Sequence, residues 1–342
     1  MRRILGGLLL AAYLCLPGIV QAQQTLEKLT ITSGGDGMHY FPVYIARGGG
    51  FFAKEGIEAD WVNVNSGTRQ AASVMGGSAD MTPMAFFHVI KARAEGADLV
   101  AIGDVFDVYG MTIVLSNAAI EKTGMTLDMP IDEKVKRLQG LKIGISSPGS
   151  STDALIRSVL LARGYDPDKV VSLLPFGAGT SILAAFEKKL VDGVVYVAPI
   201  PEIIEQRGLG KSMINPFKGD VPELNNVPFV IMATSRETLA KKHDLMARAM
   251  RAMAAAMEFA HTHPAETAKI MRPYFPDIDD SIYNTVEETY RKASARSPVL
   301  TKEQLDKTVA WMNIGAKEKT TANFDLVVDD SLATEALASL KK

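Results

Sequence analysis

Residues 39–103 read HYFPVYIARGGGFFAKEGIEADWVNVNSGTRQAASVMGGSADMTPMAFFHVIKARAEGADLVAIG, and this stretch decides the fold. Strand-like segments at 57–64 and 99–104 alternate with helix-like segments at 67–75 and 84–94. Such a β-α-β order favours a largely parallel sheet covered by helices. The loops at one edge of that sheet are where α/β proteins bind ligands.

The same alternation restarts after a polar and irregular segment at 116–139. Strands are expected at 141–146, 170–174 and 191–197, with helices between them. A late apolar strand at 227–234 is placed to return the chain to the first unit. We therefore expect two α/β units, followed by a helical tail.

Four methionines in the tail, Met246, Met250, Met253 and Met257, recur at helical spacing with alanines between them. A metal or cofactor role is conceivable for this stripe. A helix face buried in the core is the better interpretation, because methionine is an adaptable core residue.

The N-terminus has the pattern of a secretory signal peptide. Arg2 and Arg3 precede an apolar run at 4–16, and Ala22 ends a small-residue cleavage pattern. The alternative, a membrane anchor, is disfavoured because the run is shorter than the roughly 20 residues that span a bilayer. We expect residues 1–22 to be removed and the mature protein to be periplasmic.

Cys15 is the only cysteine, and it lies inside the predicted signal peptide. Leu14 precedes it, whereas lipid attachment requires a small residue there, so we expect no lipidation. The mature chain would contain no cysteine, and therefore no disulfide and no thiolate metal site.

Composition disfavours several function classes. Lys and Arg number 37 against 39 Asp and Glu, giving a net charge of −2 without a long basic run, so no nucleic-acid partner is expected. The five histidines are too scattered to suggest a metal site, and no catalytic motif such as G-x-S-x-G occurs. We expect a protein that is not an enzyme and has no cofactor.

An ordered series of short motifs carries a family resemblance. It includes Gly50-Phe51-Phe52, Ser66-Gly67, 140–144, 147–152 and 164–167. With them, the chain resembles the NMT1/THI5-like (SsuA/TauA-like) solute-binding proteins of ABC importers.

The resemblance implies a type II periplasmic binding protein fold, with a ligand cleft between two lobes that close by hinge motion. Lobe one would comprise 23–115 plus 228–342, and lobe two 116–227. The implied partners are a small organic solute and the permease and ATPase subunits at the inner membrane. We expect a monomer.

Strand-to-helix joints supply the candidate cleft residues. Those of lobe one are His39, Tyr40, Ser66, Gly67, Thr68, Met84 and Phe86. Those of lobe two are Ser150, Ser151, Thr152, Gly177, Ala178 and Pro199.

These residues also have ordinary structural interpretations. Ser150 or Ser151 could simply cap a helix, and His39 could be a satisfied core residue. Asp153 would oppose an anion if it pointed into the cleft. Val197-Ala198-Pro199 occupies the place where sulfonate-type relatives often have a Trp-Asp-Pro pattern; the Trp and Asp are missing here, which puts a taurine-like ligand in doubt.

Two other functions remain open. The THI5 branch contains an enzyme of pyrimidine synthesis, but the cysteine-rich motif of that branch is missing from this chain. A sensory protein that presents a liganded lobe to a membrane receptor would use the same closure, and the sequence does not separate it from transport.

Overall fold

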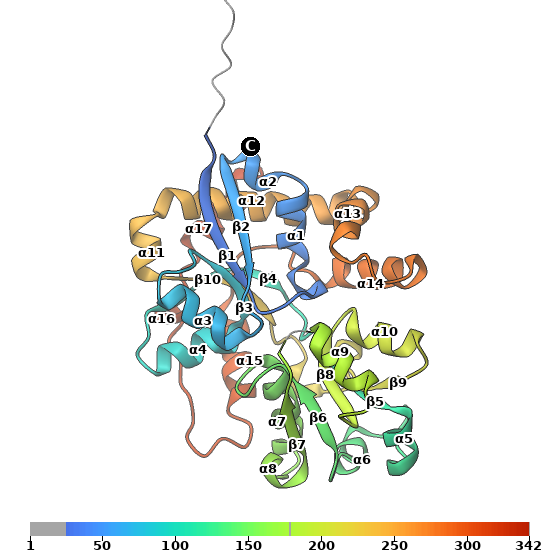
Figure 1. Cartoon of the computed structure of the whole chain (residues 1–342). Coiled ribbons are helices and arrows are strands. Elements are labelled where there is room, and N and C mark those ends of the chain that lie inside the picture. Colours follow the sequence, from blue (N-terminus) through green and yellow to red (C-terminus); the bar gives the residue numbers. More distant parts are fainter. Residues whose placement is uncertain (1–24, 178, 342) are drawn as a thin grey trace, which may run out of the picture.

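The computed structural model describes residues 25–177 and 179–341, arranged as two α/β units one above the other (Figure 1). The predicted signal peptide, Cys15 and Ala178 lie outside the described residues. Within the described part, no helix is both long and apolar enough to cross a membrane.

The first unit is built on strands β1 (Glu27–Ser33), β2 (Ile57–Asn63), β3 (Thr82–Ala85), β4 (Leu99–Phe106) and β10 (Val230–Ser235). β1 and β2 pair in parallel, and a parallel bridge from Ile31 to Met81 joins β1 to the chain just before β3. β10 lies between β3 and β4 and is antiparallel to both. All strands of this unit therefore run the same way except β10.

The second unit has the same arrangement. Its sheet contains β5 (Met111–Ser116), β6 (Lys142–Ile145), β7 (Ser172–Pro175), β8 (Gly193–Val197) and β9 (Gly210–Ile214), in the order β7-β6-β8-β5-β9. β6 is parallel to β7 and β8, whereas β5 is antiparallel to β8 and β9. Here β5 is the single reversed strand, which confirms the predicted class of two mostly parallel sheets.

Helices flank both sheets (Figure 1). In the first unit and the tail they are α1 (Phe41–Gly48), α2 (Phe51–Lys54), α3 (Gly67–Met75), α4 (Phe86–Ala94), α11 (Arg236–Lys241), α12 (His243–Thr262), α13 (Pro264–Met271), α14 (Asp280–Ala293), α15 (Lys302–Met312), α16 (Phe324–Val327) and α17 (Ser331–Ser339). In the second they are α5 (Asn117–Thr123), α6 (Ile131–Lys136), α7 (Ser151–Leu161), α8 (Pro167–Val170), α9 (Gly179–Glu187) and α10 (Ile200–Gln206).

The segment at 116–139 is more ordered than expected. It contains α5 and α6 rather than irregular chain. Ser116 begins α5, since its Oγ accepts a hydrogen bond from the Ala119 N–H at 3.2 Å. Both helices are short, and short helices show little hydrophobic periodicity in sequence.

The methionine stripe lies in the core, as predicted. Met246, Met250, Met253 and Met257 of α12 are each at most 1% exposed. α12 packs against α1 and α17, so these side chains fill the space between the tail and the first unit. Each contributes about 2 kcal/mol through burial.

Strand membership bears on where the two predicted lobes divide. β5 belongs to the second sheet, so a boundary drawn from strand pairing falls between Phe106 and Met111 rather than after residue 115. The return passage lies between Ile214 and Val230, which includes the predicted position near 228. The division into two lobes remains a prediction, and strand pairing favours a first boundary a few residues before the predicted one.

Candidate functional site

The carboxyl ends of the parallel strands of both sheets face a common cavity. The segment after β1, the first turns of α3 and the end of β3 reach it from the first unit, and the segment after β6 and the end of β8 reach it from the second. The starts of the two reversed strands complete it. The lining residues are Gly34, Gly35, His39, Tyr40, Gly67, Gln70, Ala85, Met111, Ser146, Ser150, Ser151, Thr152, Tyr196, Val197, Phe229 and Val230.

The cavity is small, about 40 Å³. That volume accommodates about three water molecules, whereas pockets for drug-sized ligands reach several hundred Å³. Residues from both units enclose it, so the two units are close together here. The backbone N–H of Met38, in the first unit, donates at 3.1 Å to the carbonyl of Ala198, in the second.

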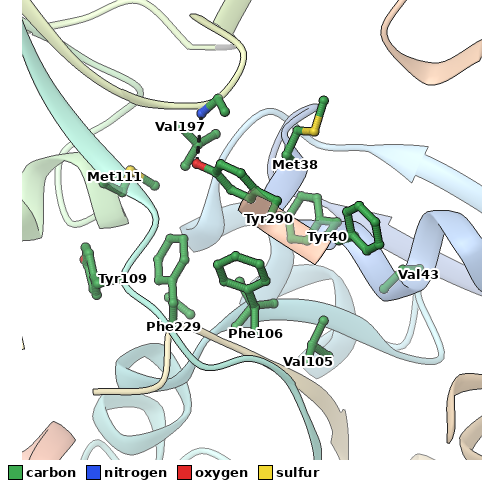
Figure 2. Packing of buried hydrophobic residues seen from close by; sticks show 14 of the residues in the cluster. Met38, Tyr40, Val43, Val105, Phe106, Tyr109, Met111, Val197, Phe229 and Tyr290 are labelled. Carbon is green, nitrogen blue, oxygen red and sulfur yellow. Dashed lines mark hydrogen bonds between the residues drawn. The ribbon is translucent and has the colours of Figure 1, made fainter. Parts of the chain in front are cut away.

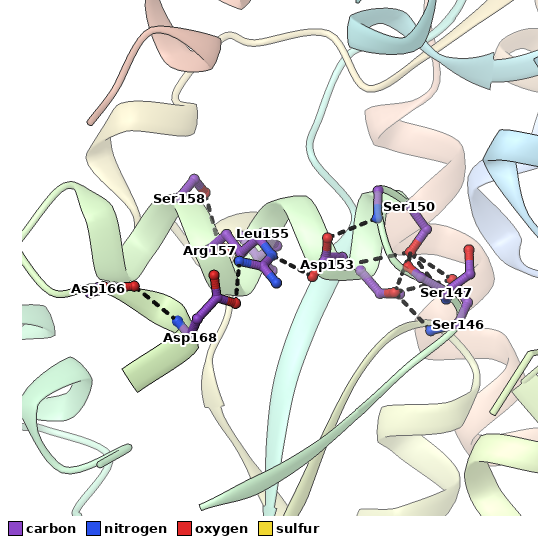
Figure 3. Close-up of polar contacts among 11 residues, drawn as sticks. Ser146, Ser147, Ser150, Asp153, Leu155, Arg157, Ser158, Asp166 and Asp168 are labelled. Atoms are coloured by element: carbon purple, nitrogen blue, oxygen red, sulfur yellow. Dashed lines mark hydrogen bonds and ion pairs between the residues drawn. The ribbon is translucent and has the colours of Figure 1, made fainter. Parts of the chain in front are cut away.

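On the second-unit side, hydroxyls at the start of α7 form a closed network (Figure 3). Ser150 Oγ donates to Ser147 O at 2.6 Å and accepts from Ser146 Oγ at 2.9 Å. Thr152 Oγ1 accepts from the Ser146 N–H at 2.9 Å. The strand end and the helix start are thereby held together, which places the first turn of α7 at the cavity.

Asp153 does not face the cavity as a free carboxylate. Its oxygens accept hydrogen bonds from the Gly149 N–H and from Arg157 Nε, each at 2.8 Å (Figure 3). Arg157 also pairs with Asp168. The charge of Asp153 is thus balanced within α7 and its neighbours, and the conflict with an anion that the sequence raised does not arise.

On the first-unit side, Gln70 is the most constrained polar group. It is 2% exposed, and its Nε2 donates to Thr82 Oγ1 at 2.8 Å and to Pro83 O at 2.5 Å. The Tyr40 hydroxyl accepts from the Gly34 N–H at 3.2 Å and lies 3.5 Å from Gln70 Oε1. These bonds join the loop after β1 to α3 and β3.

The titratable groups that line the cavity are neutral at physiological pH. Burial lowers the pKa of His39 to about 3, so its imidazole is uncharged. Burial also raises the pKa of Tyr40 to about 12 and the pKa of Tyr196 further. No Asp, Glu, Lys or Arg is among the described residues that line the cavity.

Aromatic side chains, among them Phe229 of the cavity lining, pack together next to the cavity (Figure 2). Phe229 lies with its ring 5.4 Å from His39 and 4.5 Å from Tyr109. The Tyr109 hydroxyl donates to Ser151 O at 3.2 Å. The Tyr290 hydroxyl, on α14, accepts from the Ala198 N–H at 3.3 Å.

Six of the predicted residues line the cavity, namely His39, Tyr40, Gly67, Ser150, Ser151 and Thr152. Their ligand contact remains a prediction. The structural interpretation of Ser150 also holds, because its Oγ accepts from the Asp153 N–H at the start of α7.

The other predicted residues lie elsewhere. Ser66 caps α3, and Thr68 is exposed. Met84 and Phe86 are each 1% exposed and pack into a second apolar core instead of lining the cavity. Pro199 lines a separate hollow beside α10, Gly177 is outside the lining, and Ala178 is outside the described residues.

Sequence reasoning missed several lining residues. Gln70 lies inside a helix, and Met111, Phe229 and Val230 stand at the starts of the reversed strands. The only sequence signal for Gln70 was a polar residue at a core position of an amphipathic helix. Among residues 25–177 and 179–341, no group of three or more His, Cys, Asp or Glu residues could hold a metal ion.

Comparison with known proteins supplies the family. The family model described as "NMT1-like family" matches residues 35–272. The chain is 22% identical to the putative binding protein YtlA of Bacillus subtilis, over 81% of this chain and 79% of that protein. A shorter match, 27% identical over 31% of this chain and 28% of the relative, is to the 4-amino-5-hydroxymethyl-2-methylpyrimidine phosphate synthase of Uromyces fabae.

Solved structures show the same fold. The ligand-binding component of an ABC-type import system from Staphylococcus aureus aligns with a TM-score of 0.70, at 13% identity, over 91% of this chain and 99% of that chain. The periplasmic nitrate-binding protein NrtA from Synechocystis aligns with a TM-score of 0.69, at 16% identity, over 92% and 89%. The periplasmic binding protein fold that the motifs implied is confirmed, and the chain belongs to the NMT1-like family.

Proposed function

We propose that this protein is the periplasmic solute-binding component of an ABC importer. It would capture a small organic solute between its two lobes and deliver the solute to a permease and its ATPase at the inner membrane. The relative named as a putative binding protein and the solved structure named as the ligand-binding component of an import system support this proposal. The chain would act as a monomer, without catalysis.

One observation carries the proposal, namely that residues of both units enclose a single cavity at the carboxyl ends of their strands. Gln70 and Tyr40 come from the first unit, and Ser151, Thr152 and Tyr196 from the second. A solute held by both would favour the closed form over the open one, because it has contacts with the second unit only after closure. A permease would recognise that closed form.

The direct test is to identify what the mature protein carries. The full chain would be expressed in a bacterial host so that residues 1–22 direct its export, the mature protein would be purified without denaturation, and native mass spectrometry would measure the mass of any bound solute. We expect a stoichiometric small molecule that raises the melting temperature when added back to refolded protein. A refolded, monodisperse protein that neither carries nor regains a solute would contradict the proposal.

Two variants on the same helix separate binding from folding. Thr152→Val removes a hydroxyl from the cavity wall and should weaken solute binding about tenfold or more. Ser158→Ala removes a hydroxyl that donates to Leu155 O at 2.9 Å within α7, and it should leave binding unchanged. Equal losses in both variants would point to a general effect on α7 rather than a site.

An enzyme is the second candidate, favoured by the partial match to the pyrimidine phosphate synthase. In that case the purified protein would retain pyridoxal phosphate covalently, or turn over with iron. Absorbance above 380 nm that resists dialysis, and disappears on borohydride treatment, would favour the enzyme. A protein that shows no absorbance above 380 nm and releases an intact solute would favour transport.

A further inference from the structure

The side-chain amide of Gln70 has a single possible orientation. Pro83 O can only accept a hydrogen bond, and the Thr82 hydroxyl donates its own hydrogen to Thr32 O at 2.7 Å. Both groups must therefore accept from Gln70, so the atom they contact is the amide nitrogen. The carbonyl oxygen Oε1 is left on the side of Gly34 and Tyr40, which line the cavity.

Oε1 of Gln70 retains capacity to accept a hydrogen bond. The Tyr40 hydroxyl donates to it from 3.5 Å, at the limit of a hydrogen bond, and a carbonyl oxygen has two lone pairs. A Cβ added to Gly34 would lie 2.5 Å from Oε1. Glycine at position 34 therefore leaves this buried oxygen uncovered.

The opposite wall presents donors. Ser151 and Thr152 are the first residues of α7, an 11-residue helix, and the first backbone N–H groups of a helix have no partner within it. The same end carries the partial positive charge of the helix. On the first-unit side, His39 is 7% exposed, and its Nδ1 atom has no hydrogen-bond partner among the described residues; this atom donates or accepts according to the tautomer of the neutral ring.

The two walls therefore differ in polarity, and neither carries a net charge. From this arrangement we infer that the solute is a compact, uncharged molecule with an N–H or O–H donor beside a carbonyl-type acceptor, of which a carboxamide is the simplest example. The inference rests on the proposed solute-binding function. The donor would bind Gln70 Oε1, and the acceptor would lie at the start of α7.

Anions without a donor group fit this arrangement poorly. Any oxygen of nitrate, acetate or a sulfonate that lay against Gln70 Oε1 would place two acceptors together in a buried site, with no hydrogen between them. The amide nitrogen of Gln70 cannot turn to relieve this contact, because Thr82 and Pro83 hold it. A site built to accept a hydrogen bond discriminates strongly against ligands that cannot donate one.

Four probes of nearly equal size test the inference on the wild-type mature protein, stripped of bound solute. Acetamide has a donor and an acceptor, acetone has only the acceptor, and acetate and nitrate are anions. Ligand-observed NMR titrations should show acetamide binding at least about tenfold more tightly than each of the others. Equal binding of acetone, or tighter binding of acetate or nitrate, would overturn the inference, and so would no binding of acetamide.

A variant assigns the preference to Gln70. Gln70→Leu should lose the preference for acetamide over acetone, while Arg69→Ala, at an exposed neighbouring position, should keep it. Circular dichroism and melting would establish that both variants fold, and the wild-type ranking stands without them. An anion co-purifying with the protein would overturn this inference and leave the proposed function intact, whereas a protein that binds no solute at all would overturn both.

Discussion

Tyr290→Phe should weaken solute binding while preserving the packing of both units. The Tyr290 side chain is 5% exposed, and its hydroxyl accepts from the Ala198 N–H at 3.3 Å and donates to Gly110 O at 3.1 Å. Phenylalanine keeps the ring, which stacks on Phe106 at 5.4 Å. The substitution therefore removes only the hydroxyl that joins α14 to the end of β8 and the start of β5 (Figure 2).

The size of the effect follows from the groups left unpaired. A buried backbone group that loses its hydrogen bond costs about 1–3 kcal/mol. If these contacts form only on closure, that cost weakens binding about 5- to 150-fold, because each 1.4 kcal/mol corresponds to about tenfold. Calorimetry with the solute that co-purifies would measure the dissociation constant, and thermal unfolding of the solute-free protein would measure stability.

Tyr283→Phe is the matched control. The Tyr283 hydroxyl also donates to a backbone carbonyl, that of Ala268, but both residues belong to the α13–α14 segment. This variant should lose stability without losing affinity. The reasoning about closure would be refuted if Tyr290→Phe bound solute as tightly as the wild type, or if both variants lost affinity equally.

Three further predictions follow from burial and backbone geometry. Burial lowers the pKa of both His39 and His88 to about 3, below the 6.5 of an unfolded histidine, so the folded state binds fewer protons between these values and stability falls as pH drops below 6.5. His88→Gln should reduce this loss of unfolding free energy by about 2–3 kcal/mol at pH 4.5, measured by urea titration, and an unchanged pH profile would be inconsistent with the burial. Met253→Ala should cost about 2–5 kcal/mol of unfolding free energy because the side chain is fully buried, whereas the control Met75→Ala, 46% exposed, should cost less than about 0.5 kcal/mol; similar losses would contradict the packing of α12. Gly35→Ala places a methyl group 2.8 Å from the Tyr196 hydroxyl of the other unit, at a backbone φ of +149°. The loss of solute-binding free energy, measured by calorimetry, should exceed the loss of unfolding free energy, measured by thermal unfolding, and wild-type affinity would refute the close approach.

Much of the fold was predictable because its signals are local. The strand and helix alternation at 39–103 reproduces β2, α3, α4 and β4, and the glycines near 50 separate α1 from α2, with Gly50 at a φ of +72°. The helical spacing of the methionines of α12 was enough to predict that they lie in the core. The helices within 116–139 were missed because each has only six or seven residues.

The site was less predictable because its geometry depends on contacts between distant segments. Gln70 is oriented by Thr82 and Pro83, on another strand, and α3 alone does not reveal that orientation. Met111 and Phe229 reach the cavity only because the reversed strands β5 and β10 begin there, which requires the sheet order. Met84 and Phe86, like His39, were predicted to contact a ligand because they follow a predicted strand, yet both side chains belong to an apolar core cluster.

A crystal structure of the mature protein with its co-purified solute tests the central claim most directly. The account predicts electron density for one solute at the strand ends, within hydrogen-bond distance of Gln70 in the first unit and of the start of α7 in the second. Density at any other place, such as the hollow beside Pro199, or contacts with only one unit, would contradict it.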